Sequence, residues 1–295
     1  MSDSSPLSLT SRPASQVRRT SDREEVRRVL DHQRSLAAPV YGYLEERYLD
    51  HTHWFVSSTG QEPGLMFWVE GSPGANLYVQ GDEANVKALL SQVSPPRYAF
   101  LLFPQHAEGV VREHFMLRAL QRLIRMQVNR NNFALATTPH PEASQAIAGP
   151  VRLTGSNIVA VNALYRTDSG ARITRDYLNG GVYYGMWNGT QLVSVAGTQL
   201  FRPGHGIAVV ANVLTHPRHR GRGYATQCVS SVTSTLLESV QDVVLNVDPG
   251  NAPAVHSYQR LGFGSVGEVG EGWVFWKGRN WADRLGAQLM YWLMG

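Results

Sequence analysis

The sequence predicts a mixed α/β (α+β) protein of two domains. Three observations predict this class. The chain has 295 residues, 43% of them hydrophobic, which is long enough to bury about three quarters of its unfolded surface. Strand-like and helix-like runs alternate along it. Both halves also share the order helix, strand, strand, strand, helix, strand, helix, strand, which suggests a duplicated unit although no residues visibly repeat.

In the N-terminal half, residues 1–20 are rich in Ser, Pro and Arg and predict a mobile tail. The cap-like sequence Ser21-Asp-Arg-Glu24 then opens a helix whose apolar spacing is interrupted at Pro39. The stretch 117–128 is apolar, but its type stays open. The other predicted elements are strands at 54–56, 65–69, 77–79 and 98–103 and helices at 83–93 and 110–115.

A polar, proline-bearing stretch at 129–150 predicts the domain boundary. We therefore expect an N-terminal domain at 21–138, a second domain at 150–278 and a helical tail at 279–295. The turn Asn188-Gly189 predicts a hairpin, since Asn-Gly is a strong two-residue hairpin signal. The elements predicted in the second domain are strands at 151–154, 182–187, 192–200, 207–215, 243–247 and 272–276 and helices at 157–165, around 177–178, at 224–240 and at 252–261.

The cysteine count and the length of the apolar runs indicate the cellular compartment of the protein. The single cysteine, Cys228, excludes an internal disulfide and a cysteine-clustered metal site, and it lies on the apolar face of a predicted helix as core filler. No run reaches the roughly 18 apolar residues that span a bilayer, and residues 1–6 lack the features of a signal peptide. We expect a cytoplasmic protein with no membrane partner.

The basic residues are almost all arginine, 25 of 27, and the net charge is +4. The densest arginine run, at 12–28, is interleaved with acids and predicts a solvated helix face, so no nucleic-acid partner is expected. Apolar residues near the C-terminus recur at helical spacing and predict an amphipathic helix that docks on the body or on a second copy in a homodimer. These residues are Trp281, Leu285, Leu289 and Trp292.

The sharpest feature is a strand that runs into a basic, glycine-bearing turn and then a helix, Asn212–Thr226. The start of a helix leaves backbone N–H groups unpaired and carries partial positive charge. Gly221 and Gly223 allow close backbone approach, and the arginines at 218, 220 and 222 add positive potential. The turn therefore predicts a phosphate-binding site.

Two common phosphate motifs fit this turn poorly. Gly221-Arg-Gly-Tyr-Ala-Thr226 approaches the dinucleotide pattern, but Thr226 replaces the third small residue. The loop from Thr215 to Gly221 is also too long for the tight turn of that fingerprint. A P-loop is excluded because no Gly-Lys-Ser/Thr follows the glycines.

The pattern instead resembles the GNAT superfamily of acyl-CoA-dependent N-acetyltransferases. The family signature R/Q-x-x-G-x-G/A is matched by Arg218-His-Arg-Gly221-Arg-Gly223. The second family element, an asparagine followed by a tyrosine and a Leu-Gly-Phe ending, is matched by Asn251, Tyr258 and Leu261-Gly262-Phe263. The resemblance covers roughly 150–277 and implies a GNAT-type central mixed sheet flanked by helices.

The resemblance also implies site residues. The coenzyme pyrophosphate would lie on the turn and the pantetheine along the signature strand, with Asn251 bonding the pantetheine, so acetyl-CoA is the implied cosubstrate. Tyr258 matches the proton donor of the family, which protonates the leaving thiolate. The implied coenzyme-binding residues are Val213, Leu214, Thr215, Arg218, Arg220, Gly221, Arg222, Gly223, Tyr224, Ala225 and Asn251.

The sequence departs from the family at the general base. Many members place a glutamate early on the signature strand, where this chain has Ile207. The candidates nearby in sequence are His205, His256, Glu268 and Glu271, and a water relay or a neutral amine would also serve. No metal is expected, since the loop histidines His216 and His219 lack a carboxylate partner.

The corresponding turn of the N-terminal half, Val79–Glu83, carries acids where phosphates would sit. If that half is a second GNAT-like unit, it is therefore a degenerate one without coenzyme, and we expect it to shape the substrate entrance. The function expected is transfer of an acetyl group from acetyl-CoA to a primary amine of a small-molecule or peptide acceptor. A non-catalytic acyl-CoA-binding regulatory protein and a nucleotide-dependent oxidoreductase remain as alternatives.

Overall fold

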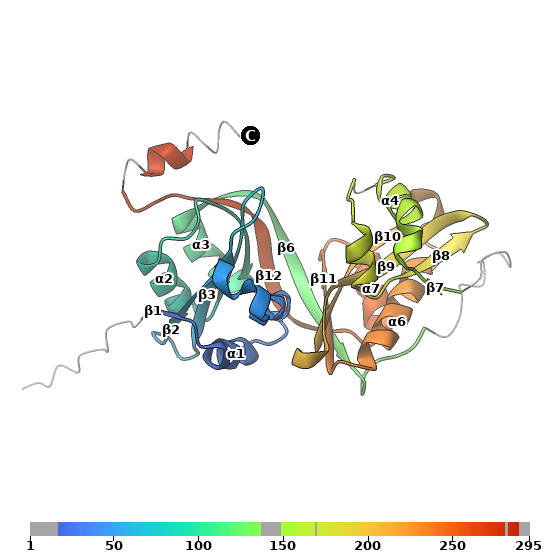
Figure 1. Cartoon of the computed structure of the whole chain (residues 1–295), viewed down its shortest axis with the longest axis horizontal. Helices are drawn as coiled ribbons and strands as arrows, with labels where there is room; N and C mark the ends of the chain where they lie inside the picture. Colours follow the sequence, from blue (N-terminus) through green and yellow to red (C-terminus); the bar gives the residue numbers. More distant parts are fainter. Residues whose placement is uncertain (1–16, 137–148, 169, 281–282, 289–295) are drawn as a thin grey trace, which may run out of the picture. The chain divides into compact units, whose positions relative to one another are not determined.

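The computed structural model describes residues 17–136, 149–168, 170–280 and 283–288 and divides the chain into two compact units (Figure 1). Unit 1 comprises residues up to His32, residues His51–Arg118 and the chain from Trp273 onward. Unit 2 comprises Gln33–Asp50 and Ala119–Gly272. The division differs from the predicted domains 21–138 and 150–278, because residues 33–50 and 119–136 belong with the C-terminal unit.

Unit 1 is built on five strands in the order β1-β2-β3-β4-β5. The first four strands pair antiparallel, and β4 and β5 pair parallel, with Ala75 opposite Ala99. The end of β12 packs against β5, where the rings of Tyr98 and Trp273 stack at 4.7 Å. The elements are β1 (Val17–Thr20), α1 (Arg23–His32), β2 (Thr52–Ser57), β3 (Gly64–Val69), β4 (Ala75–Gln80), α2 (Glu83–Gln92), β5 (Tyr98–Pro104) and α3 (Glu108–His114).

The predicted tail at 1–20 is wrong in its last four residues. Residues 17–20 form β1, which pairs with β2 in the register Arg18 opposite Val56. The cap at Thr20 explains why the strand ends there: its hydroxyl accepts from the backbone N–H of Asp22 and donates to Glu25 of α1. Residues 1–16 lie outside the described residues.

Unit 2 has the strand order β6-β11-β10-β9-β8-β7. Helices α6 and α7 share one hydrophobic core with strands β9, β10 and β11, whereas α4 and α5 pack with β8 and β9 in a second core. The elements are β6 (Phe115–Asn129), β7 (Val151–Arg152), α4 (Ile158–Tyr165), α5 (Arg175–Asn179), β8 (Tyr184–Asn188), β9 (Gln191–Arg202), β10 (Ile207–Thr215), α6 (Tyr224–Leu237), β11 (Asp242–Val247), α7 (Ala252–Arg260) and β12 (Gly264–Trp276).

The short helices complete the description, and one of them belongs to unit 2 despite its place in the sequence. The segment Gln33–Asp50 carries η1 (Ala38–Leu44) and packs on β9 and β10. Arg202 of β9 forms an ion pair with Glu45 at 2.6 Å, and Tyr41 lies against His205. The other short helices are η2 (Glu46–His51), η3 (Gln105–Ala107), η4 (Gly155–Asn157), η5 (Pro203–His205) and η6 (Pro217–His219).

Two long strands were incompletely predicted. The stretch 117–128, whose type was open, lies in the 15-residue β6, and the strand predicted at 272–276 is the C-terminal end of the 13-residue β12. Both contain residues of unit 1 and of unit 2. Arginines at 118, 122 and 125 interrupt the apolar pattern of β6, and glycines at 264, 267, 270 and 272 weaken the strand signal of β12.

The two halves repeat one topology, as their element order predicts. In each, an antiparallel strand pair is followed by a helix and a parallel strand: β3, β4, α2 and β5 in unit 1, and β9, β10, α6 and β11 in unit 2. No helix in the described part of the chain is long and apolar enough to cross a membrane. Of the predicted C-terminal helical face, Leu285 is 57% exposed, and Trp281, Leu289 and Trp292 lie outside the described residues.

Candidate functional site

Strands β10 and β11 form a fork. Their parallel pairing joins Ile207–Val210 to Asp242–Leu245 and goes no further within the described residues. Beyond it, β10 continues to Thr215 along β9, and β11 continues to Val247 along β6. The part of β10 from Ala211 to Thr215 therefore presents one strand edge without a neighbour, which is a template for an extended ligand.

A β-bulge at Asn212 bends β10 at this fork. The register with β9 shifts between Ala211 and Leu214, and Asn212 has a φ of +57°. Its side-chain amide donates to Tyr183 Oη at 2.9 Å, and Tyr165 Oη donates to its carbonyl oxygen at 2.9 Å. Because Asn adopts the left-handed region more readily than most residues, these bonds are enough to hold the bulge.

Both tyrosines that hold the bulge are buried, Tyr183 completely and Tyr165 at 3% exposed. Burial, followed by the neighbouring Tyr177, raises the pKa of each well above that of an ordinary tyrosine, so both hydroxyls stay protonated. Sequence reasoning missed Asn212, Tyr165 and Tyr183. The only local signal was an asparagine inside an otherwise mostly apolar strand.

Along β10, the backbone N–H and C=O groups of successive residues point alternately to β9 and to the open edge. The N–H of His216 bonds to the carbonyl of Val193 on β9, at 2.8 Å, and Leu214 lies opposite Val195. Since hydrogen-bonded and free residues alternate along an antiparallel strand, Val213 and Thr215 direct their N–H and C=O groups to the open edge. Among the predicted strand residues, Val213 and the N–H of Thr215 can therefore bond a ligand, whereas the Thr215 carbonyl already accepts from Arg220 Nε at 3.3 Å. The Leu214 main chain is directed at β9.

The turn that follows has the backbone of an anion site. Gly221 and Gly223 each have a φ of +75°, and a Cβ built at either would meet no described atom within 4 Å. Gly223 is the N-cap of α6, and the first helical hydrogen bond runs from Gln227 N to Gly223 O. The N–H groups of Tyr224 and Ala225 thus point out of the helix without helical partners.

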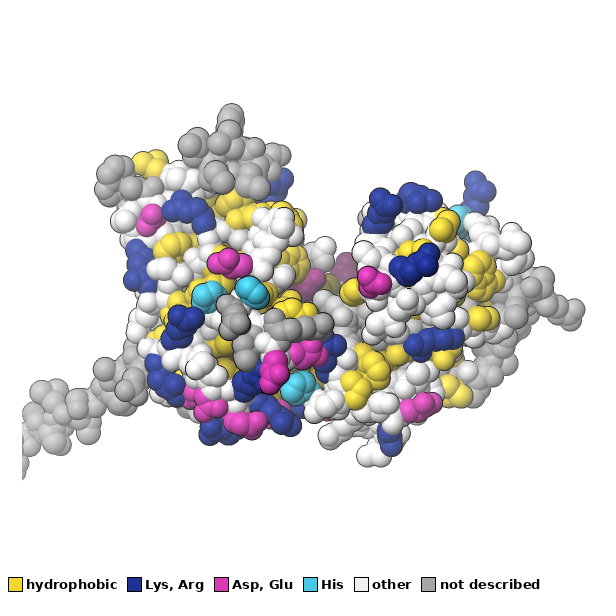
Figure 2. Space-filling model, in the orientation of Figure 1, with side chains coloured by type: hydrophobic (Ala, Val, Ile, Leu, Met, Phe, Trp, Pro, Cys, Tyr) yellow, Lys and Arg dark blue, Asp and Glu magenta, His cyan; other side chains and the backbone are white. Residues whose placement is uncertain are grey.

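The arginines of the turn are exposed around this backbone. Arg218 and Arg222 are exposed, and Arg220 pairs with Asp168 at 2.7 Å and donates from Nε to Thr215 O at 3.3 Å. In Figure 2, basic side chains gather at the end of unit 2 that carries α4, and every basic residue of unit 2 is an arginine. The positive end of the α6 dipole lies in the same turn, so the turn attracts anions.

The two residues of the second predicted motif lie on α7. Asn251 is exposed and caps the helix, since its Oδ1 accepts from Ala254 N at 3.2 Å. Tyr258 is 8% exposed and packs in the core with Phe263, and burial raises the pKa of Tyr258 to about 12. A tyrosine with this pKa holds its proton at neutral pH and can donate it to a thiolate.

The four candidates for the general base differ in position and in burial. His205 lies before the start of β10, about 25 Å along the strand from Thr215. His256 and Glu268 are exposed. Glu271 of β12 is half-buried: burial raises the pKa of its carboxyl, partly countered by the charge of Arg125.

The remaining predicted side chains have structural roles. Cys228 lies on α6 and is fully buried in the hydrophobic core. Burial raises the pKa of its thiol to about 12, which agrees with a packing role. His216 accepts from Arg218 N at 3.2 Å, so it caps η6. Burial, then the charges of Arg222 and His216, lowers the pKa of His219. In the described part of the chain, no three His, Cys, Asp or Glu residues gather into a metal site.

The equivalent turn of unit 1 is filled by a carboxylate of the chain. Asp82 caps α2 and accepts from Asn85 N at 2.9 Å and from Gln61 N at 2.8 Å. Although burial opposes it, hydrogen bonds from Asn85, Gln61 and Glu62 lower the pKa of Asp82, so it is anionic. A Cβ at Gly60 would lie 2.0 Å from the Asp82 carboxylate, so this carboxylate lies directly against the Gly60 backbone, and its charge would repel a phosphate.

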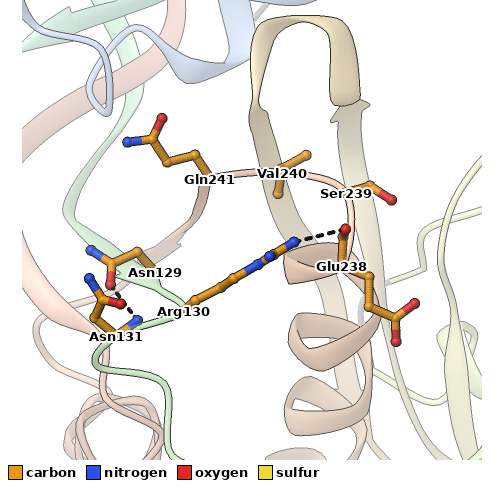
Figure 3. A pocket seen from close by; sticks show the side chains of 7 residues that line it. All are labelled: Asn129, Arg130, Asn131, Glu238, Ser239, Val240 and Gln241. Carbon is orange, nitrogen blue, oxygen red and sulfur yellow. Dashed lines mark hydrogen bonds between the residues drawn. The ribbon is translucent and has the colours of Figure 1, made fainter.

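A pocket of about 420 Å³ lies at the other end of α6 (Figure 3). Arg130 extends across it and donates to the carbonyls of Leu237 and Glu238, so its guanidinium caps the helix C-terminus. Asn129 Oδ1 accepts from the backbone of Asn131 at 2.9 Å. The pocket is polar, its groups bond one another, and it lies a helix length of about 21 Å from the glycine turn.

Comparison with known proteins gives this geometry a context. Residues 183–273 match the family model described as FR47-like protein. No curated protein matched the chain.

Several solved structures are similar over most of the chain. A GCN5-related N-acetyltransferase from Sphaerobacter thermophilus is 13% identical, with a TM-score of 0.54 over 88% of this chain and 95% of that one. A GNAT-family protein from Novosphingobium aromaticivorans DSM 12444 is 18% identical, with a TM-score of 0.53 over 83% of this chain and 99% of that one. A tandem GNAT protein from the clavulanic acid biosynthesis pathway is 10% identical, with a TM-score of 0.52 over 90% of this chain and all of that one.

At these identities the similarity shows the fold. The chain has the mixed α+β fold of the GNAT superfamily, with two GNAT-like units, as the motifs of the C-terminal half and the shared element order predict.

Proposed function

We propose that this chain, with its GNAT fold and its FR47-like segment at 183–273, transfers an acetyl group from acetyl-CoA to a primary amine by direct attack. The observation that carries the proposal is the union of two features in unit 2, the anion-binding turn at Gly221–Ala225 and the unpaired edge of β10 that leads away from it. Together they fit a long ligand that is anionic at one end and amide-bearing along its length.

The chain would hold acetyl-CoA through its backbone. N–H groups of the turn and of the first turn of α6 bind the pyrophosphate, and the exposed Arg218 and Arg222 add charge. The pantetheine then lies along β10 as an added strand, bonded to Val213 and Thr215. A backbone N–H of the bulge would donate a hydrogen bond to the thioester oxygen and so stabilise the negative charge that develops there.

The acetyl-transfer step then needs two proton movements. The amine nitrogen attacks the thioester carbon, the C–S bond breaks, and the acetyl group stays on nitrogen as an amide. The leaving thiolate takes a proton from Tyr258 Oη, which is protonated at neutral pH. The nitrogen loses one proton to a base, for which we propose the half-buried Glu271, and keeps its other N–H in the amide product.

The experiment that tests this function measures both binding and turnover. Coenzyme A should raise the melting temperature of the protein, and acetyl-CoA with a panel of primary amines should release free thiol. Binding without thiol release to any amine would favour the alternative, a non-catalytic acyl-CoA-binding protein. Stabilisation by NAD(H) rather than by coenzyme A would contradict both.

Tyr258→Phe removes one hydroxyl from a buried ring and should keep coenzyme binding while slowing turnover. Loss of a positioned proton donor costs about 10²–10⁴-fold in rate. The measurement is kcat for thiol release beside the melting shift with coenzyme A. A kcat equal to that of the wild type would remove Tyr258 from the mechanism.

If Glu271 is the base, its ionisation should set how activity depends on pH on the acid side. A base must be ionised, and burial raises the pKa of this carboxyl, so activity should rise with pH through a value above that of an ordinary glutamate. Glu271→Gln should lower kcat/KM and flatten this limb, and Glu268→Gln, an exposed neighbour, serves as the control. An unchanged acid limb in the Glu271 variant would assign the base elsewhere.

A further inference from the structure

Asn246 occupies the fork between β10 and β11. It is the first residue of β11 beyond the parallel pairing, which ends at Leu245 opposite Val210. On its other side β11 stays paired with β6, where Asn246 lies opposite Arg125. Its backbone is thus held in a regular strand beside the place where the open edge of β10 begins.

The side chain of Asn246 points away from the helices that carry the turn and Tyr258. Val243, Leu245 and Val247 of β11 belong to the core shared with α6 and α7. Because side chains alternate between the faces of a sheet, Asn246 projects from the opposite face. By the same alternation, Arg125 lies on that face too, since Met126 and Val128 belong to the α6 and α7 core.

The amide oxygen of Asn246 is buried and has no hydrogen-bond partner among the residues that the structure describes. A buried acceptor without a donor is unfavourable, and native structures seldom keep one without a reason. An oxygen at this position lacks an N–H or O–H donor, and a ligand in the fork would supply it.

The segment 33–50 covers part of the sheet face from which Asn246 projects. Arg125, fully buried on β6, donates from Nη1 to Ser35 O at 3.1 Å, so the segment 33–50 covers the neighbouring strand. Ser35 Oγ donates to Gln127 of the same strand, and Gln127 donates to Asp242 at 2.7 Å. Ser35, Gln127 and Asp242 thus bond in series, whereas the oxygen of Asn246 has no partner among the described residues.

We propose that Asn246 binds the acceptor amine: its Oδ1 accepts one N–H of the attacking nitrogen and aims the nitrogen lone pair at the thioester. This inference rests on the proposed function and assigns its acceptor side. Asn246 projects from the face opposite α6 and α7, and the coenzyme enters from the turn at the start of α6. An amine approaching the thioester from the other face therefore enters the fork on the side from which Asn246 projects.

The proton balance makes this contact selective for primary amines. The neutral amine carries two N–H groups when it attacks. One proton leaves the nitrogen as the amide forms, and the thiolate is protonated as the C–S bond breaks. The other N–H remains on the amide product and stays bonded to Asn246 throughout. A secondary amine has a single N–H, which it must surrender, so it cannot keep this bond.

The test compares Asn246→Leu with the wild type, using acetyl-CoA with butylamine and with N-methylbutylamine. Loss of one hydrogen bond to the nucleophile should lower kcat/KM for butylamine about tenfold and reduce the preference for butylamine over N-methylbutylamine. The melting shift caused by coenzyme A should not change. Removal of the unpartnered oxygen should leave the melting temperature equal to that of the wild type or a few degrees higher.

Thr233→Val is the matched control. Thr233 of α6 also has a buried oxygen without a described partner, but it lies away from the fork, in the helix, so this variant should keep full activity. An unchanged amine preference in Asn246→Leu would overturn the inference alone, and a lost coenzyme shift would assign the oxygen to the coenzyme instead. A wild type that binds coenzyme A but releases thiol neither with these two amines nor with any primary amine of the panel would overturn the proposed function as well.

Discussion

Gly221→Glu is expected to abolish the stabilisation of the protein by coenzyme A. At about 100 times its dissociation constant a ligand adds about 2.7 kcal/mol, which for a chain of this size raises the melting temperature by about 5–10 °C. Gly221 has a φ of +75°, which a side chain disfavours, and a carboxylate there would repel the pyrophosphate. The measurement is the melting temperature with and without coenzyme A.

A matched control separates loss of the site from loss of the fold. Gly189, in the turn between β8 and β9, has a φ of +57° and open space around its Cα, so Gly189→Glu imposes similar backbone strain and the same charge. That variant should keep the full shift with coenzyme A. If Gly221→Glu is stabilised as strongly as Gly189→Glu, the phosphate site lies elsewhere.

A chain of residues 150–278, the domain that the sequence predicts, is expected not to fold by itself. It lacks β6, which pairs with all of β11 from Asp242 to Val247. Met126 and Val128 of β6 are at most 1% exposed, and burial of two such side chains contributes about 3–6 kcal/mol. That is a large share of the 5–15 kcal/mol by which domains are stable.

The loss should appear as a non-cooperative thermal transition and poor dispersion of amide resonances, measured beside the full chain. A chain of residues 17–278 restores β6, the segment that packs on β9 and β10, and β1 and α1 of unit 1, so it should recover cooperative unfolding. A cooperative transition in 150–278 at the melting temperature of the full chain would show that β6 is dispensable to unit 2.

The sequence predicted the glycine turn well because its signal is local. Gly221, Gly223 and the start of α6 lie within a few residues, and the backbone geometry they require is set by residue type. The bulge at Asn212 was missed because it depends on Tyr165 and Tyr183, which are distant in sequence and reach it only in the folded sheet. The position of Asn246 at the fork could not be predicted either, because the sequence of a strand does not show where its pairing with a neighbouring strand ends.

Domain limits were the weakest prediction for the same reason. Composition placed a boundary in the polar stretch 129–150, but β6 before that stretch is hydrogen-bonded to β11 after it. The segment 33–50 reads as part of an N-terminal helical region, yet its ion pair from Glu45 to Arg202 belongs to unit 2. Pairing between strands that are distant in the sequence decides where a domain ends, and such pairing is hard to predict from one sequence.

The carboxylate of Asp82 has a consequence for how the duplicated fold is used. Unit 1 keeps the strand-to-helix turn of its counterpart but supplies the anion from within its own chain, as a permanent internal substitute for a phosphate. Saturation should therefore be reached at one coenzyme molecule per chain. Freed from ligand binding, the first copy can diverge as a scaffold while the second keeps the chemistry.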